Sequence, residues 1–282
     1  MKNLSLNKKT LTPVGTHFLL ILIGIIFLLP LYSMFVTSLT SEANLYVRES
    51  KFLLKNLEFS SYKHALQAGP WGRYFFNSLL VSSLVTLGQL VTASMAGYAF
   101  ARFDFVGKNL IFYAILGTMM IPVEITIIPN YMILSSLGWL DSYYALIIPF
   151  LAHSFGIFFI RQHVMTIPEG LFDAAQIDGC GYIRSLWKIV LPLSKPTLAT
   201  VGLITFLNNW NTFLWPMIVT NSDKLRTVQI ALARFQAGDI IGVTPWNQVM
   251  AATVIVTLPI IVVFLLAQKQ LISGMMSGGM KF

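Results

Sequence analysis

The sequence predicts an all-α membrane protein that crosses the bilayer six times. Of its 282 residues, 56% are hydrophobic and only 11% are charged, and the mean hydropathy is +0.72. This composition leaves too little polar surface to coat a water-soluble globule of this length. The apolar residues also gather in stretches of roughly 20, the length that a helix needs to span the hydrocarbon core. Both observations indicate a chain that lies in lipid.

Six apolar stretches define the predicted spans, and the segments between them hold nearly all the ionisable residues. The first stretch follows a lysine-rich start, as in a signal peptide, but it is too long and lacks a small-residue cleavage site, so a retained helix is expected. One membrane domain, residues 1–282, is expected to contain all six spans. Their predicted positions are 17–39, 74–101, 109–129, 143–161, 197–219 and 247–268.

The cations of the short loops predict the orientation of the chain. Six spans place both termini on one side of the membrane. Lysines lead the first span, cations bracket the turn near 102–108 and lysines follow the last span, whereas residues 130–142 carry none. Short cytoplasmic loops are enriched in Lys and Arg, so both termini are expected in the cytoplasm. The net charge of +8 then reflects topology rather than nucleic-acid binding, because the cations are divided between two sides.

The residues do not support enzymatic or metal chemistry. The single cysteine, Cys180, and the four histidines have no spacing typical of metal ligands. No nucleophile and base are brought together by the sequence, and no phosphate-binding Gly-x-x-x-x-Gly-Lys-Ser/Thr loop occurs. An ion-coupled carrier would need several intramembrane carboxylates and repeated halves. One such carboxylate, Glu124, and no convincing repeat are found, so a carrier of this kind is the distant alternative. No metal and no cofactor are therefore expected on this chain.

The connection between the fourth and fifth spans, residues 162–196, is too long for a simple link, since loops beyond about 12 to 15 residues are usually functional. Thr166 and Glu169 have the spacing of a capping box, in which each side chain satisfies an amide at a helix start. A helix is therefore predicted from there to Gly179, a residue suited to the left-handed position after a helix.

A second short helix is predicted in the same connection, ending before Pro192. Two such helices would suit a docking element for a soluble partner. The alternative is an amphipathic helix on lipid headgroups, which the acidic character of the first helix disfavours. The second helix is expected to place its apolar residues on one face and its cations on the other, with Ile183, Leu186, Trp187 and Val190 opposite Arg184 and Lys188.

The connection contains Asp173-Ala174-Ala175, Asp178-Gly179 and the run 189–193. These residues resemble the EAA loop of permeases of ATP-binding-cassette (ABC) importers, with Asp173 in place of the usual Glu and Cys180 in place of Ala. Trp210-Asn211, Trp215-Pro216, Trp246-Asn247 and the closing run 274–279 are similar to the carbohydrate-uptake branch. Segments 121–124, 140–143 and 159–162 look nearest to the second permease of glycerol-3-phosphate importers.

The resemblance implies a type I ABC importer permease fold in a bacterial cytoplasmic membrane. Its implied partners are a homologous second permease, two ATPase subunits that use ATP and Mg²⁺, and an extracytoplasmic solute-binding protein. The implied substrate is a sugar or polyol phosphate, with glycerol 3-phosphate preferred and maltose-type or other oligosaccharides as the alternative. The implied ATPase contacts are Glu169, Asp173, Ala174, Ala175, Asp178 and Gly179 in the EAA helix and Gly274, Gly278 and Gly279 in the C-terminal tail.

Five polar or aromatic residues are candidates for the substrate passage. Amides hydrogen-bond hydroxyl groups, and indole faces cover the C–H surfaces of sugars. The alternative for the asparagines is that they hold membrane helices together. A carboxylate within a span is costly and therefore suggests a function, although a structural pair or a water-exposed position is the alternative. The candidates are Asn208, Trp210, Asn211, Trp215 and Glu124.

Overall fold

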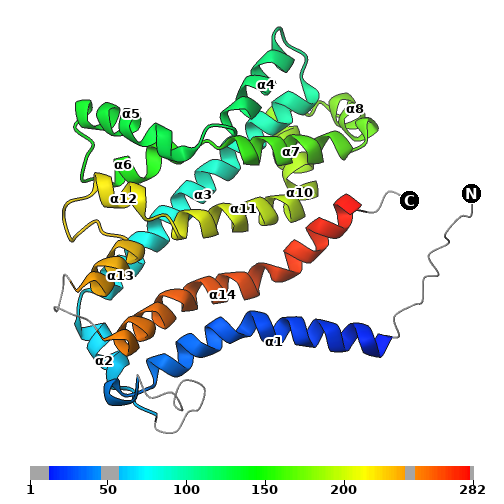
Figure 1. Cartoon of the computed structure of the whole chain (residues 1–282). Helices are drawn as coiled ribbons and strands as arrows, with labels where there is room; N and C mark the ends of the chain where they lie inside the picture. The colour runs from blue at the N-terminus through cyan, green and yellow to red at the C-terminus, as the bar shows by residue number, and fades with distance from the viewer. Residues whose placement is uncertain (1–12, 46–56, 239–244, 280–282) are drawn as a thin grey trace, which may run out of the picture. The chain divides into compact units, whose positions relative to one another are not determined.

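The computed structural model describes residues 13–45, 57–238 and 245–279, and every regular element within these ranges is helical (Figure 1). Two bent helix pairs in the described chain would each complete a further span, so the number of candidate spans is four to six by length and composition. The all-α prediction is confirmed, and six is the upper value that the structure allows. The four segments that are each long and apolar enough to cross a bilayer are Gly15–Ser38, Trp71–Arg102, Tyr143–Thr166 and Trp246–Gln268, and helical structure in the third is interrupted after Phe150.

The chain divides into two compact units, of which the first contains the described parts of Met1–Gly69 and Phe235–Ile255. Its helices are α1 (Pro13–Ser38), the 3₁₀ turn η1 (Glu42–Asn44), α2 (Ser60–Gln67) and the start of α14 (Trp246–Gly279). The buried Ser38 hydroxyl shares a 2.7 Å hydrogen bond with Tyr62 of α2. The Asn247 amide donates to the Thr40 carbonyl at 3.0 Å. These two bonds fasten the end of α1.

The second unit contains Pro70–Arg234 and residues 256–282 as far as they are described. Its long helix α3 (Trp71–Arg102) is central, and α7 and α11 pack along it (Figure 1). The elements that follow α3 are α4 (Lys108–Thr118), α5 (Val123–Ser136), α6 (Tyr143–Ile147), η3 (Ile148–Phe150), α7 (Ser154–Thr166), α8 (Glu169–Ile177), α9 (Tyr182–Ser185), η4 (Leu186–Val190), α10 (Leu191–Leu193), α11 (Lys195–Trp210), α12 (Leu214–Val219) and α13 (Val228–Ala237).

A glycine allows α3 and α7 to approach closely. A Cβ atom added at Gly97 would lie 2.8 Å from Cγ2 of Ile160 and 2.9 Å from the backbone nitrogen of Arg161. Ile160 is fully buried, so neither neighbour can move aside freely. Small residues have this role wherever membrane helices pack backbone to backbone.

We therefore expect Gly97→Ala to separate α3 from α7 and to lower the free energy of unfolding by about 1–3 kcal/mol, the usual cost of overpacking. Gly117→Ala is the matched control, because a Cβ there meets nothing within 4 Å. Thermal unfolding of the two variants in detergent checks this expectation. Equal melting temperatures would show that the close approach is not required.

Three predicted spans are broken rather than continuous, which corrects the sequence-based expectation. Within 109–129, α4 ends at Thr118 and α5 starts at a 99° bend after Pro122. Within 143–161, helical structure stops after Phe150 and resumes at Ser154, and α7 then runs on to Thr166. Within 197–219, residues 211–213 separate α11 from α12. Proline disfavours the helical conformation in the residue before it and has no N–H to donate, which accounts for the bend at Pro122.

Polar side chains on α3 satisfy the backbone that the break after Phe150 exposes. The Gln89 amide donates to the Phe150 carbonyl at 2.8 Å, and the Thr92 hydroxyl donates to the Leu151 carbonyl at 2.8 Å. An unpaired carbonyl in hydrocarbon costs several kcal/mol, so a membrane helix can break only where other groups replace the lost bonds. Gln89 and Thr92 therefore permit this break.

Candidate coupling helix and passage residues

The helix α8 begins differently from the prediction. Glu169 is its first residue and Pro168 is its cap residue, and no side chain caps this end. Thr166 instead ends α7, and its hydroxyl donates to the carbonyl of His163 at 2.7 Å. The predicted capping box is therefore wrong. A hydroxyl in the last turn of one helix finds a carbonyl one turn back, and this bond takes up the Thr166 donor.

The end of α8 agrees with the prediction. Gly179 has φ +72°, the left-handed conformation that glycine adopts without strain. The Gly179 N–H donates to the Gln176 carbonyl at 3.0 Å, and the Cys180 N–H donates to the Ala175 carbonyl at 2.8 Å. These two bonds form a Schellman motif, so the chain leaves α8 in a fixed direction.

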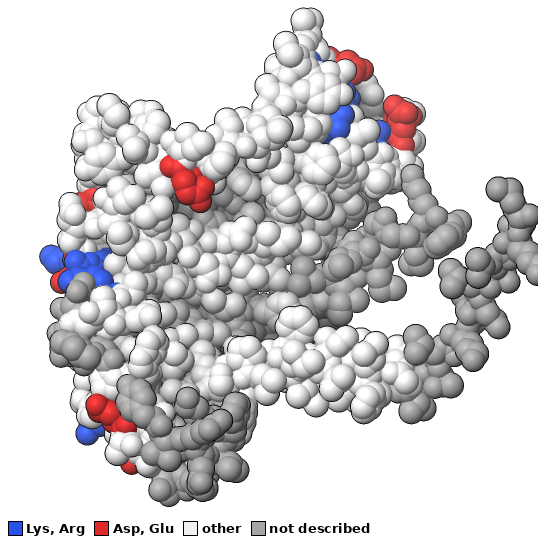
Figure 2. Space-filling model, viewed as in Figure 1, with Lys and Arg blue, Asp and Glu red and all other residues white. Residues whose placement is uncertain are grey.

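The surface of α8 is acidic, and Figure 2 shows acidic side chains gathered at the place of α8 in Figure 1. The exposed acidic residues of α8 and its cap are Glu169, Asp173 and Asp178, and no lysine or arginine lies on the helix. Ala174 is exposed and Ala175 is half-buried. The structure thus brings the six predicted coupling residues together on one short helix and its cap.

Arg102, the last residue of α3, holds α8 against the rest of the unit. Its guanidinium donates to the Val164 carbonyl at 3.1 Å and also to the Ile167 carbonyl at the end of α7. The guanidinium carbon lies 4.3 Å from the centre of the Phe172 ring on α8, within the range of a cation–π contact. One side chain therefore contacts α7 and α8 from the end of α3.

Arg161 of α7 makes the reciprocal contacts. Its Nε donates to the Phe100 carbonyl near the end of α3 at 3.2 Å, and its guanidinium carbon lies 4.1 Å from the centre of the Phe112 ring on α4. Arg102 and Arg161 thus each bind the carbonyl end of the other's helix. We call these two residues the arginine pair. In the sequence, the cation at Arg102 indicates only the topology, and no local pattern marks its pairing with Arg161.

The helical segment after α8 continues through Pro192, which corrects its predicted end. Helical structure extends from Tyr182 to Leu193 and includes a π-helical turn, η4, before the chain bends at Ser194. A π-helix bonds residue i to i+5 instead of i+4. The Leu191 N–H bonds the Leu186 carbonyl in the π-helical pattern, and the Ser194 N–H bonds the Val190 carbonyl in the α-helical pattern. Pro192 lies where one pattern changes to the other. We attribute the continuation of the helix to this change, because the N–H that proline lacks is not needed there.

The predicted apolar face of this segment is only half buried. Leu186 and Val190 are 9% and 0% exposed and pack in a core cluster with residues of α3, α4 and α7. Ile183 and Trp187 are 76% and 66% exposed. The four apolar side chains therefore do not pack together, because the neighbouring helices cover only one side of the segment.

The candidate passage residues are in different environments. Asn208 and Asn211 are exposed at the end of α11, and Glu124 is exposed in the first turn of α5. Trp210 and Trp215 are only 2% and 6% exposed. In this conformation the two tryptophans are core residues, contrary to the expectation that they face a passage.

Contacts inside the chain account for the burial of both tryptophans. The Trp215 indole donates to the Ala145 carbonyl at 3.0 Å. The Trp210 ring packs against Phe75 and Phe206, with ring centres 6.3 and 6.0 Å apart. The passage role therefore remains a prediction for the two exposed asparagines and Glu124.

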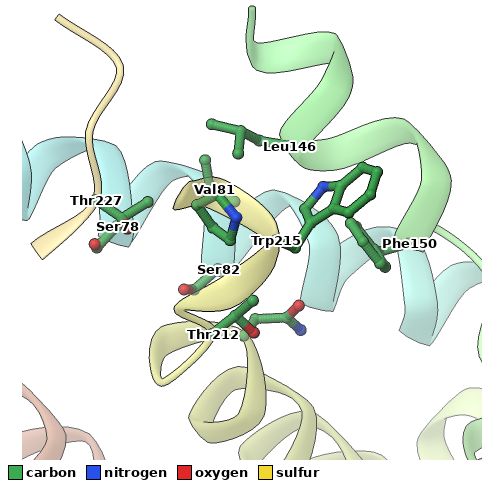
Figure 3. Close-up of a pocket in the computed structure, with 10 residues that line it drawn as sticks. Ser78, Val81, Ser82, Leu146, Phe150, Thr212, Trp215 and Thr227 are labelled. Carbon is green, nitrogen blue, oxygen red and sulfur yellow. The ribbon is translucent and has the colours of Figure 1, made fainter. Parts of the chain in front are cut away.

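A cavity beside Trp215 is too small for a solute (Figure 3). Its volume is about 40 Å³, enough for water but not for a sugar. The Thr227 hydroxyl in its wall has no protein partner, which fits a hydrated cavity. The lining residues are Ser78, Val81, Ser82, Leu146, Phe150, Asn209, Thr212, Trp215, Pro216 and Thr227.

Asn77 ties the segment before α13 to α3. This side chain is fully buried, and its amide group donates to the Lys224 carbonyl at 3.0 Å and to the Arg226 carbonyl at 2.8 Å. Its oxygen accepts from the Tyr143 hydroxyl at 2.7 Å. Asn77 could not be predicted from the sequence, because its partners are mostly backbone carbonyls far away in the sequence.

Asp141 fastens the loop before α6 to the end of α12. Its carboxylate accepts from the N–H groups of Asn221 and Ser222, at 2.9 and 3.0 Å, and from the Ser222 hydroxyl at 3.1 Å. These bonds, above all that from the Ser222 N–H, hold the pKa of Asp141 below its ordinary value. Asp141 also has φ +53°, a conformation that Asp and Asn tolerate better than other side chains.

We expect Asp141→Asn to lower the free energy of unfolding by about 1–2 kcal/mol at neutral pH, because charge-assisted hydrogen bonds are roughly twice as strong as neutral ones. Asparagine keeps the backbone conformation. A carboxylate whose pKa is lowered by folding stabilises the protein above about pH 3.9, the pKa of Asp in the unfolded chain. This stabilisation is lost as the pH falls through the pKa of Asp141 in the folded protein. Melting curves in detergent from neutral to acid pH should therefore converge for the two proteins. A difference that does not change with pH would contradict this.

The helices and the site together define a membrane transport component rather than an enzyme. The helices of the second unit are broken where membrane spans are expected, and an exposed acidic helix lies at the joined ends of α3 and α7. Residues 89–277 match the family described as "Binding-protein-dependent transport system inner membrane component", and the chain belongs to that family. The resemblance to ABC importer permeases is confirmed, as is the expectation of a non-catalytic subunit.

Individual relatives agree with this assignment. The chain is 35% identical to the sn-glycerol-3-phosphate transport system permease protein UgpE of Yersinia enterocolitica over 92% of this chain and 94% of that one. It is 32% identical to the arabinooligosaccharides transport system permease protein AraQ of Bacillus subtilis over 92% of each chain. A crystal structure of a bacterial ABC transporter involved in alginate import has the same fold, with a TM-score of 0.79 and 24% identity over 91% of this chain and 95% of that one.

Proposed function

We propose that this chain is a permease subunit of an ABC importer in a bacterial cytoplasmic membrane and that α8 is its docking site for an ATPase. The supporting observation is the exposed acidic helix that the Arg102 guanidinium joins to the ends of α3 and α7. A closing ATPase pair would move α8, and the arginine pair would carry that motion into the spans as a rigid-body change.

The proposed assembly follows from the family. This subunit would pair with a homologous permease, rest on two ATPase subunits and receive its solute from an extracytoplasmic binding protein. ATP and Mg²⁺ would be bound by the ATPase and not by this chain. Both termini would lie in the cytoplasm, with Gly274, Gly278 and Gly279 in contact with the ATPase. These glycines lie on the last turns of α14, whose surroundings the structure does not describe.

The proposed substrate is a sugar or polyol phosphate, with glycerol 3-phosphate preferred and an oligosaccharide as the alternative. The names of the two relatives support both classes, at 35% identity for the glycerol-3-phosphate permease and 32% for the arabinooligosaccharide permease. The exposed Asn208 and Asn211 offer amides that suit hydroxyl groups of either class.

Binding assays on the solute-binding protein that stimulates this permease complex separate the two substrate classes. We expect glycerol 3-phosphate or a glycerophosphodiester to raise the melting temperature of that binding protein and oligosaccharides to leave it unchanged. A shift with maltose-type or arabinose-containing oligosaccharides and none with the phosphates would exclude the preferred substrate.

A further inference from the structure

The segment Tyr182–Leu193 and α11 form one of the two bent helix pairs. The two helices are bent by 80°, and only together are they long and apolar enough to count as a candidate span. The ring Nε2 of His163, in the last turns of α7, lies 3.2 Å from the Leu193 carbonyl. The Leu193 end of the segment therefore lies beside the end of the candidate span Tyr143–Thr166. We take α11 as running across the membrane, and a helix bent by 80° from it then lies near the membrane plane.

Its outer face combines large apolar side chains with cations. The side chains of Tyr182, Ile183 and Trp187 are 69%, 76% and 66% exposed. Arg184 and Lys188 are also exposed and lie one turn apart. Among the residues that the structure describes, neither cation forms an ion pair. The opposite face, with Leu186 and Val190, is packed inside the unit.

The charge of this face is opposite to that of α8, although the two helices are adjacent in the chain. α8 carries carboxylates and no cation, so a negatively charged membrane surface would repel it. Tryptophan and cations are the residues that anchor helices at the boundary between acyl chains and headgroups. The two helices therefore suit different partners.

We propose that the outer face of Tyr182–Leu193 binds anionic phospholipid. Arg184 and Lys188 would contact headgroup phosphates, and Ile183 and Trp187 would insert at the acyl-chain boundary. The inference rests on the proposed function in taking this surface as cytoplasmic. Anchored in this way, the segment would keep the start of α11 at a fixed depth while α8 moves with the ATPase.

A fluorescent label at position 183 tests this proposal in the whole importer complex. Cys180→Ala removes the native thiol, and Ile183→Cys provides the attachment site. Ile177→Cys is the matched control, since Ile177 is 87% exposed but lies on α8. The complexes are placed in nanodiscs of phosphatidylcholine, with or without an equal amount of phosphatidylglycerol, and a lipid that carries a quencher near the headgroup is added. We expect quenching at position 183, stronger with phosphatidylglycerol, and none at position 177.

A charge-removal experiment identifies the cations. Combining Ile183→Cys with Arg184→Gln and Lys188→Gln should lower the preference for phosphatidylglycerol about five-fold for each lost charge. Lys63→Gln with Lys224→Gln removes two exposed cations elsewhere and should leave that preference unchanged.

The outcomes separate this inference from the proposed function. Absence of quenching at position 183 in a complex that still transports its solute would overturn the lipid proposal alone, and cross-linking of that position to a protein subunit would do the same. Quenching at position 183 without any ATPase contact at α8 would leave the lipid site intact and overturn the docking proposal.

Discussion

Ala175→Arg is expected to abolish ATP-driven uptake while the chain still inserts and folds. Ala175 is half-buried on α8 and has only a methyl group for a side chain. An arginine there would prevent the ATPase subunit from packing closely against the helix. The backbone should keep its shape, because the Ala175 carbonyl bond to the Cys180 N–H does not depend on the side chain. Loss of about 2 kcal/mol at the centre of an interface would lower uptake at least about 30-fold.

Uptake and membrane insertion of the variant should be measured together. Ala43→Arg is the matched control, since it makes the same chemical change at an exposed alanine in the turn η1, and its uptake should equal that of the unaltered protein. Normal uptake by Ala175→Arg would show that α8 is not gripped by a partner.

Arg102→Met is expected to uncouple ATP hydrolysis from uptake. The methionine keeps an apolar stem against Phe172 but loses both carbonyl bonds and the cation–π contact. Hydrogen bonds from charged donors contribute about 1.5–3 kcal/mol each, so the free energy of unfolding should fall by about 3 kcal/mol. With α8 no longer fixed to α3 and α7, the ATPase should still hydrolyse ATP in the complex while uptake falls.

The ratio of solute imported to ATP hydrolysed in proteoliposomes measures this effect. Arg73→Met is the matched control, because Arg73 lies at the other end of α3 and donates to a single carbonyl, that of Lys224, at 2.9 Å. Its ratio should be unchanged. An equal drop in both activities for Arg102→Met would indicate a purely structural role.

Four of the six predicted spans coincide with helical segments that are long and apolar enough to cross a bilayer, but the continuity of the helices could not be predicted from the sequence. Pro30 and Pro259 lie inside the unbroken helices α1 and α14, whereas α5 begins only after Pro122. The local sequence is apolar in all three cases. Whether a membrane helix can break depends on polar groups that arrive from other helices, as Gln89 of α3 does for the break after Phe150.

In the candidate site, too, features that depend on neighbouring residues in the sequence were predictable, and features that depend on distant residues were not. The end of α8 was predictable because Gly179 is a local signal for a left-handed residue. The arginine pair was not, because Arg102 and Arg161 bind backbone carbonyls about 60 residues away. Every residue carries such a carbonyl, so no side-chain pattern marks the partner. The burial of Trp210 likewise depends on Phe75 of another helix.

The proposed function depends most directly on contact between α8 and an ATP-hydrolysing subunit. Cross-linking in native membranes tests this, using Ala174→Cys together with Cys180→Ala so that the exposed helix position carries the only thiol. We expect this thiol to capture the ATPase and a thiol placed at Ala43 not to do so. Failure to capture any ATP-hydrolysing protein from position 174 would contradict the docking proposal.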